Sequence, residues 1–166
     1  MAVADLLEYM KTNDFLFTLA RSIHLLPFEA RKDSQAIFSY ALRFRPPGST
    51  DEDAPGLSYV INERPEVLIE LCRGYGHRDS ALPCGMVLRE IIKQHEAVAA
   101  IILYDNSQGD GPASTFRDID TQMIQTGDGV FWEFFKYIDQ GAFEVSADAF
   151  TTFRVGHTSL ITLILY

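Results

Sequence analysis

Apolar residues recur at helical spacing through much of the chain and predict four helices from residue 65 onward. The expected ranges are residues 65–76, 80–94, 131–138 and 142–153. In each range the apolar positions are three or four residues apart, which places them on one face of a helix. The expected inward positions are Leu68, Leu71, Cys72, Tyr75, Ala81, Cys84, Leu88, Ile91, Ile92, Phe131, Phe134, Phe135, Ile138, Phe143, Ala147, Phe150 and Phe153.

Turn-forming residues indicate where the two central helices begin and end. Pro65 suits a first helical turn, and Gly74 and Gly76 suit a C-terminal stop. Ser80 is expected to cap the next helix, in which Pro83 is tolerated because first-turn N–H groups have no partner within the helix. Strand signals are few, so the predicted class is all-α.

Two stretches are predicted to be surface loops inserted between helices. Residues 45–56 are rich in proline, glycine and acidic residues, and residues 105–129 contain glycines and many hydroxyl or amide side chains. The run Asp51-Glu52-Asp53 is interpreted as a solvated acidic loop, because no calcium-loop spacing follows it.

One pattern of helices occurs three times along the chain, in residues 15–43, 67–93 and 130–154. Each segment is an apolar helix ending in a basic residue (Arg21, Arg73 or Lys136), a short turn, and a second helix with small residues. Without the loops the period is about 42 residues, which is typical of armadillo and HEAT repeats. Small side chains at Ala36, Gly85 and Ala149 are expected to let helices approach closely. The pattern predicts a helical-repeat solenoid, a class that usually binds other proteins.

Composition and charge exclude several functions. The 166 residues suffice for one domain, and 23 acidic against 14 basic residues give a net charge of −9. Such a chain, without a basic stripe, is a poor candidate for nucleic acid or anionic membranes. The two cysteines are too few for a disulfide framework and suit a reducing compartment. The N-terminus has no pattern of a secretory signal. The apolar runs are too short to span a membrane. A cytosolic protein is expected.

No set of residues has the spacing of a catalytic, metal or cofactor site. His77-Arg78-Asp79 spells the start of a kinase catalytic loop, but the required asparagine is replaced by Cys84. Cys84 as a nucleophile, with His77 or His95 as base, is an alternative to a buried structural cysteine. The histidines and cysteines form no metal-ligand pair. Trp132 lies off the apolar stripe and is expected to be exposed or to pack between repeats.

Three segments resemble a known family. They are residues 28–43, the run Cys84-Gly85-x-x-Leu88-Arg89-Glu90, and the run from Ser146 to Arg154. In this order they resemble the calcium-binding-protein-39-like family, also called mouse-protein-25-like scaffolds, and its fungal branch of conidiophore development proteins. The resemblance covers residues 1–154 apart from the two loops, and implies an armadillo-like right-handed solenoid that is incomplete at both ends.

The resemblance implies a scaffold without enzymatic activity or cofactor. Members bind sterile-twenty-type kinases or related pseudokinases along a concave face and stabilise the active kinase, which in fungi serves polarised growth and morphogenesis. The candidate partner-binding residues are Phe143, Lys136 and Asp148; by spacing alone, Phe143 could equally fill the core. The alternatives are a generic armadillo-like adaptor, a thiol enzyme centred on Cys84, and a truncated fragment without function.

Residues 155–166 depart from the family pattern. They are apolar and β-branched, where an amphipathic helix is expected. Because valine codons begin with GT, as a typical intron does, we hypothesise that this tail is translated intron. Sequencing of transcripts is expected to show few reads that continue from the codon of Arg154 into the tail in this frame; abundant in-frame reads would refute the hypothesis.

Overall fold

The computed structural model describes residues 3–49, 54–95, 97–105, 113–120, 124–139 and 142–165, with side chains up to residue 160. The described ranges contain α-helices and three short 3₁₀ turns, and no strand. The prediction of an all-α protein is therefore confirmed. The acidic run Asp51-Glu52-Asp53 lies outside the described residues.

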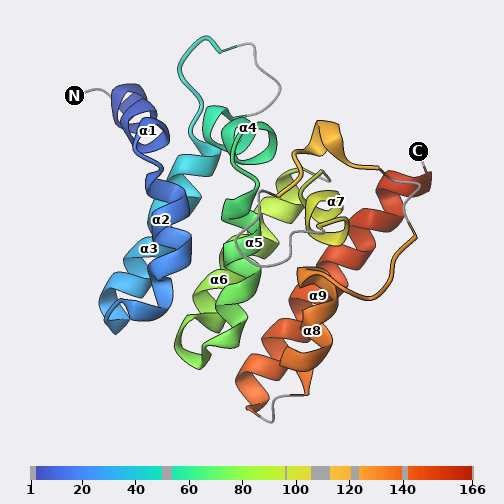
Figure 1. Cartoon of the computed structure of the whole chain (residues 1–166). Helices are drawn as coiled ribbons and strands as arrows, with labels where there is room; N and C mark the ends of the chain where they lie inside the picture. The colour runs from blue at the N-terminus through green and yellow to red at the C-terminus, as the bar shows by residue number, and fades with distance from the viewer. Residues whose placement is uncertain are drawn as a thin grey trace.

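The helices form three groups of three that stand side by side (Figure 1). The first group is α1 (Val3–Thr12), α2 (Phe15–Ser22) and α3 (Phe28–Arg43), with η1 (Ile23–Leu25). The second is α4 (Pro55–Asn62), α5 (Glu66–Arg73) and α6 (Arg78–Gln94), with η2 (Gly74–Gly76). The third is α7 (Ala97–Leu103), α8 (Val130–Ile138) and α9 (Phe143–Leu165), with η3 (Phe116–Asp118) between α7 and α8. This arrangement is a helical-repeat solenoid, and its ends lie at opposite ends of the row.

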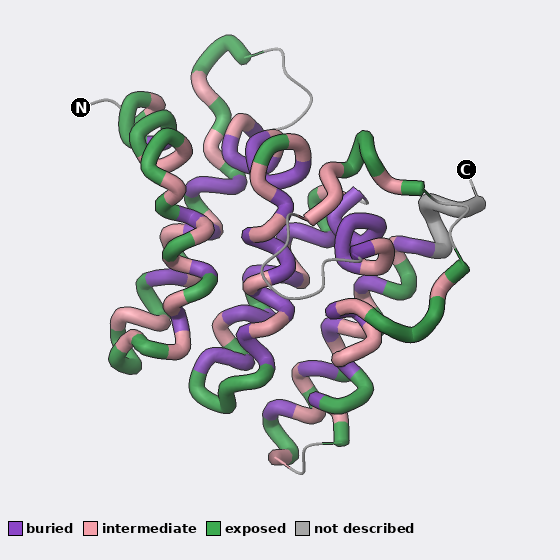
Figure 2. Tube along the Cα trace, viewed as in Figure 1, coloured by how far each residue is buried: buried purple, intermediate pink, exposed green. Residues whose placement is uncertain are grey.

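Each repeat holds three helices, where the sequence pattern suggested two. The short helix α4 begins at Pro55, inside the loop expected over residues 45–56, and α7 follows α6 almost directly. A proline at the start of α4 is favourable because the first N–H groups of a helix have no partner within it. All residues of α7 are apolar and most are buried, and five of the eight residues of α4 are buried as well (Figure 2).

The third helices of the first two repeats share one local sequence pattern. Lys32-Asp33-Ser34 in α3 recurs as Arg78-Asp79-Ser80 in α6, 46 residues later. With the same shift of 46 residues, Arg43 of α3 is equivalent to Arg89 of α6. A further shift of 65 residues makes both equivalent to Arg154 in α9. Arg78 and Asp79, two residues of the triplet that imitates a kinase catalytic loop, therefore belong to a motif that α3 and α6 share.

The serines of this motif are buried and bond to backbone oxygen atoms. Ser34 Oγ donates to the carbonyl of Ala30 at 2.8 Å, and Ser80 Oγ donates to that of Gly74 at 2.7 Å. Ser80 does not cap α6, which begins at Arg78 after an extended His77. The earlier start leaves Pro83 in the second turn of α6, not in the first turn as expected.

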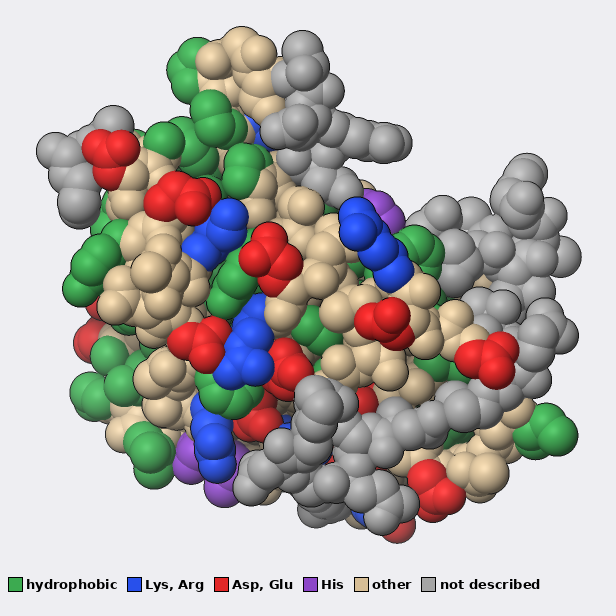
Figure 3. Space-filling model, turned by 45° about the horizontal axis from the view of Figure 1, so that its top comes forward, with side chains coloured by type: hydrophobic (Ala, Val, Ile, Leu, Met, Phe, Trp, Pro, Cys, Tyr) green, Lys and Arg blue, Asp and Glu red, His purple; other side chains and the backbone are tan. Residues whose placement is uncertain are grey.

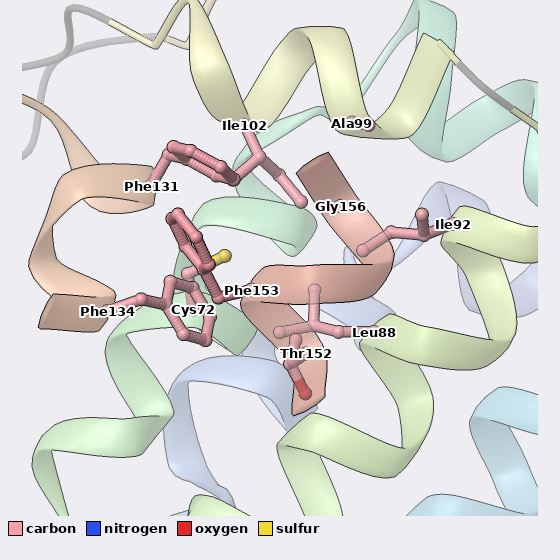
Figure 4. A pocket seen from close by; sticks show the side chains of 10 residues that line it. All are labelled: Cys72, Leu88, Ile92, Ala99, Ile102, Phe131, Phe134, Thr152, Phe153 and Gly156. Carbon is pink, nitrogen blue, oxygen red and sulfur yellow. The ribbon is translucent and has the colours of Figure 1, made fainter. Parts of the chain in front are cut away.

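The predicted inward positions of α5 and α6 are all buried, and this prediction is confirmed. The core continues into the third repeat, where Cys72, Leu88 and Phe131 line the same small apolar space (Figure 4). Burial of such side chains contributes roughly 1.5–3 kcal/mol each.

The apolar stripes predicted for α8 and α9 are partly wrong. Phe131 and Phe134 are buried, but Phe135 is 53% exposed. In α9 the buried positions include Val145, Ala149 and Thr152, whereas Phe143, Ala147 and Phe150 are exposed. Ala36 is also exposed, so only Gly85 and Ala149 of the three small residues serve close packing.

Trp132 is half-buried beside the core of the third repeat, so it is neither exposed nor packed between repeats as expected. Its indole N–H donates to Gln125 Oε1 at 3.2 Å, and its ring stacks on Phe135 with the centroids 6.1 Å apart. The aromatic residues of α8 thus continue from the core to the surface of the third repeat.

A polar clamp joins the first repeat to the second. Arg64, which precedes α5, donates two hydrogen bonds to Asp14 between α1 and α2, at 2.8 and 2.6 Å. Asp14 adopts a left-handed backbone conformation with φ of 55°. The hydrogen bonds from Arg64 hold the pKa of the Asp14 carboxyl below its usual value. The guanidinium also lies over the ring of Phe17, 4.2 Å from its centroid.

A second polar cluster joins the second repeat to the third. The Arg89 guanidinium of α6 pairs with Asp148 at 2.8 Å and donates to Thr152 at 2.6 Å, both in α9. The hydroxyl of Tyr75 donates to Asp148 and contacts Thr152. Because Tyr75 is buried, the pKa of its phenol is raised well above the ordinary value. We call these four residues the Arg89 cluster.

Helix α9 continues without interruption from Phe143 to Leu165. The backbone remains α-helical at Arg154, where the sequence pattern predicted the end of the family-like segment. The origin of residues 155–166 stays a hypothesis. Within the described ranges, no helix has both the length and the hydrophobicity that crossing a membrane requires.

Replacing Gly85 by alanine is expected to destabilise the fold. A Cβ at this position would overlap Tyr75 Oη and Asp148 Oδ2, both of which are fixed in the Arg89 cluster. Overpacking of this kind costs about 1–3 kcal/mol, measurable by urea denaturation. Gly76→Ala is the matched control, because a Cβ there meets no atom within 4 Å. Equal stability of the two variants would contradict the expectation.

Candidate functional site

The exposed sides of α3, α6 and α9 form a surface that crosses all three repeats. In the repeat register, Lys32, Arg78 and Phe143 occupy equivalent positions, as do Ala36, Leu82 and Ala147. Tyr40, Met86 and Thr151 form the next equivalent row. We call these nine residues the third-helix face.

Apolar side chains are unusually prominent on the third-helix face. Tyr40 is 80% exposed, Met86 46% and Leu82 39%. Exposed apolar side chains gathered on one surface are typical of sites that bind other proteins.

Two hollows lie along this face. One, of about 230 Å³, lies between the starts of α3, α6 and α9, with Phe28, Leu82 and Val145 among its lining residues. The other, of about 630 Å³, follows α3 beside Tyr40. Each is large enough for one or a few side chains of a partner, but the two do not form one deep pocket of the kind that encloses a small molecule.

Charges of both signs accompany the apolar positions. Arg31 of α3 pairs with Asp79 of α6 at 2.9 Å, and Arg43 of α3 pairs with Glu90 of α6. Basic and acidic side chains are also interspersed on the side of the molecule that Figure 3 draws. Mixed charge of this kind suits a protein partner better than the phosphates of a nucleic acid.

The candidate residues Phe143 and Lys136 flank the connection between α8 and α9. Phe143, at the start of α9, is 85% exposed and does not fill the core. Lys136, in the last turn of α8, is also exposed, and its ammonium lies 3.5 Å from Glu133. Their accessibility is compatible with a partner contact.

The candidate residue Asp148 is placed differently. One carboxylate oxygen pairs with Arg89 and the other accepts from Tyr75, and its side chain is largely buried. These contacts hold α9 against α6, so Asp148 has little capacity left for a partner.

The two cysteines are buried, which confirms the structural interpretation of Cys84. Burial raises the pKa of the Cys84 thiol to about 12, and the negative charge of Asp148 contributes to this rise. Burial likewise raises the pKa of Cys72. A thiol that stays protonated and is shielded from solvent is a poor nucleophile, so this geometry disfavours the thiol enzyme.

The histidines considered as bases make other contacts. The His77 ring stacks on His24, with the centroids 4.0 Å apart, and His95 Nδ1 accepts from the backbone N–H of Ala97 at 3.0 Å. In the part of the chain that the structure describes, no three His, Cys, Asp or Glu side chains are grouped closely enough to hold a metal ion.

Three-helix repeats with an exposed third helix define a class of helical-repeat proteins that bind other proteins. Within that class, the family model described as Mo25-like matches residues 1–161. The chain therefore belongs to the Mo25-like family, and the resemblance inferred from the residues is confirmed.

Curated relatives support the same assignment. The chain is 52% identical to the conidiophore development protein hymA of Emericella nidulans, over 96% of this chain and 42% of that protein. It is 35% identical to calcium-binding protein 39-like of mouse, over 92% of this chain and 37% of that protein. The Mo25-like protein of Schizosaccharomyces pombe is 30% identical over 92% of this chain and 37% of that protein. The chain thus spans less than half the length of these relatives.

The third-helix face beyond Phe143 was not predicted from the sequence. Tyr40 and Met86 were missed because single exposed apolar residues have no pattern of their own. The signal that could have found them is the recurrence of Lys32-Asp33-Ser34 as Arg78-Asp79-Ser80, which sets the register of the third helices.

Cys84 is expected to react with iodoacetamide only when the protein unfolds. Since the thiol is buried and its pKa is raised, its alkylation at pH 8 should be slower than that of an unfolded-chain cysteine by orders of magnitude. The measurement is mass spectrometry of the native protein over time, with a urea-unfolded sample as reference. Rapid labelling of Cys84 in the folded protein would contradict this expectation and support the hypothesis of a thiol enzyme.

Proposed function

We propose that this chain is a non-catalytic scaffold that binds a sterile-twenty-type kinase or a related pseudokinase and stabilises its active state. The pathway is one that controls polarised growth and morphogenesis. Membership of the Mo25-like family supports the scaffold role. The printed name of the Emericella nidulans relative, a conidiophore development protein, supports the link to morphogenesis. The proposed compartment is the cytosol.

The observation that carries the proposal is the third-helix face with Phe143 at its edge. Phe143 is a large apolar side chain that is 85% exposed, and such a side chain gains most from burial against a partner. Tyr40, Leu82 and Met86 extend the apolar contact to the other two repeats. A kinase lobe is large enough to contact all three third helices at once.

Lys136 and Asp148 have separate roles in this proposal. Lys136 supplies a basic group beside Phe143, where it can pair with an acidic side chain of the kinase. Asp148 acts as a positioning residue, because its bonds to Arg89 and Tyr75 fix α9 and thereby Phe143.

Stabilisation of an active kinase requires no chemistry by the scaffold. A protein that binds the active conformation more tightly than the inactive one shifts the population toward the active form. A rigid surface does this best, since it loses little conformational freedom on binding. The Arg89 cluster and the Asp14–Arg64 clamp provide that rigidity between repeats.

Affinity purification of the tagged chain from its native cells, followed by mass spectrometry, tests the partner class. Recovery of a sterile-twenty-type kinase or pseudokinase is the expected result. Recovery of other specific partners without any kinase would favour a generic armadillo-like adaptor. Recovery of chaperones alone would mean that this chain is a fragment and that the function belongs to a longer protein.

Phe143→Ser is expected to weaken binding to the purified kinase by roughly tenfold or more, because truncating an interface anchor typically costs above 1 kcal/mol. Lys136→Glu should weaken it less, since a peripheral charge mainly affects the association rate. Isothermal titration measures both. Ile124→Ser is the control, because Ile124 is exposed to the same extent as Phe143 but lies outside the third-helix face. Equal binding by Phe143→Ser and Ile124→Ser would exclude Phe143 as a contact.

A further inference from the structure

The two ends of the segment between α7 and α8 lie together. Asp105 follows α7 and Gly129 precedes α8, and a Cβ on Gly129 would overlap the carbonyl oxygen of Asp105. Gly129 has a φ of 94°, a backbone conformation that favours glycine. The residues between these two are therefore not needed to cover the distance from α7 to α8, so their contacts indicate another role.

Residues 113–119, which we call the strap, lie against the second repeat. Within the strap, η3 contacts α4 of the second repeat as well as α7 of the third (Figure 1). The ring of Phe116 meets that of His95, directly after α6, edge to face with the centroids 6.2 Å apart. Ala113 and Ile119, at the two ends of the strap, pack against the core. A segment of the third repeat thus bridges the second and third repeats.

One hydrogen bond attaches the strap to the polar clamp between the first two repeats. The backbone N–H of Ala113 donates to Glu66 Oε1 at 3.1 Å. The other oxygen, Glu66 Oε2, is shielded from solvent and lies 3.1 Å from Arg64 Nη1. The Nε and Nη2 atoms of Arg64 bind Asp14 of the first repeat. A continuous series of polar contacts therefore runs from the third repeat through the second to the first.

Asp14 and Glu66 share the guanidinium of Arg64, so the position of Glu66 affects the clamp. The side chain of Glu66 is 17% exposed, and charges that are partly buried are screened less by water and salt. The strap binds one oxygen of Glu66 and leaves the other for Arg64. Without the strap, both oxygens of Glu66 would be available to Arg64 and would draw it away from Asp14.

We propose that the strap holds the three repeats in one fixed arrangement, because it keeps Glu66 where Arg64 can bind Asp14 with two hydrogen bonds. In a solenoid each repeat contacts only its neighbours, so a change in one repeat ordinarily affects the adjacent interface. The strap adds a link from the third repeat to the junction of the first two. Its detachment would loosen the first repeat while the core of the third stays intact. The inference does not depend on kinase binding.

A double-mutant cycle tests this coupling. In the strapless variant two glycines replace residues 106–128, which the contact between Asp105 and Gly129 permits. Asp14→Asn keeps a residue that tolerates the left-handed backbone and should lower the urea midpoint of the wild-type chain. In the strapless variant the same substitution should lower the midpoint by about half as much or less, because the clamp is already weakened.

The matched control for the cycle is Arg43→Ala, which breaks another ion pair between the first two repeats, that of α3 with Glu90. It should lower both midpoints equally, since Arg43 is not part of the series of contacts from the strap. Equal effects of Asp14→Asn in the two backgrounds would overturn the proposal.

Hydrogen exchange gives a second test that needs no deletion. The amide of Ala113 should be protected in the wild-type chain, and Glu66→Ala should raise its exchange rate by roughly tenfold or more. Glu70→Ala is the control, because Glu70 also lies in α5 and pairs with an arginine, Arg73, but does not contact the strap through an ion pair or hydrogen bond. An unprotected Ala113 amide in the wild-type chain, or equal effects of the two variants, would overturn the proposal.

Discussion

The close approach of α6 to Tyr75 and Asp148 is the constraint on which the rest of the third repeat depends. Gly85 has no Cβ, so Tyr75 and Asp148 can occupy the space beside it and bind Arg89 and Thr152. The charge of Asp148 is acceptable there because two donors satisfy its oxygens. A half-satisfied pair would instead cost several kcal/mol. The orientation of α9, and with it of Phe143, follows from this one cluster.

One rule joins the successive repeats. An arginine that ends the motif of one third helix binds an acidic residue of a neighbouring third helix, as Arg43 binds Glu90 and Arg89 binds Asp148. Because each repeat contacts only its neighbours, the stability of a solenoid is approximately the sum of the stabilities of the single repeats and of the interfaces between adjacent repeats.

The apolar residues of the molecule have two roles, since some form the core between the repeats and others lie on the third-helix face. Most of those of α4, α5 and α7 are buried and hold the stack together, and Cys72 of α5 and Cys84 of α6 are also buried. Those of the third-helix face remain exposed although α3, α6 and α9 are firmly packed on their other side. A rigid scaffold with an accessible apolar surface is what a protein needs to select one conformation of a partner. No chemistry by the chain itself is required for that role.

The sequence by itself determined the helical class, the threefold repeat and the buried faces of α5 and α6, because helical periodicity depends on neighbours three or four residues away. It also determined the family, since the runs around Cys84 and Asp148 are local. Only the tertiary structure decided that each repeat has three helices, that Phe135, Phe143 and Phe150 face outward, and that Asp148 pairs with Arg89. The physical reason is that the spacing of apolar residues indicates which side chains share a face of a helix. Whether that face is buried depends on whether another helix covers it.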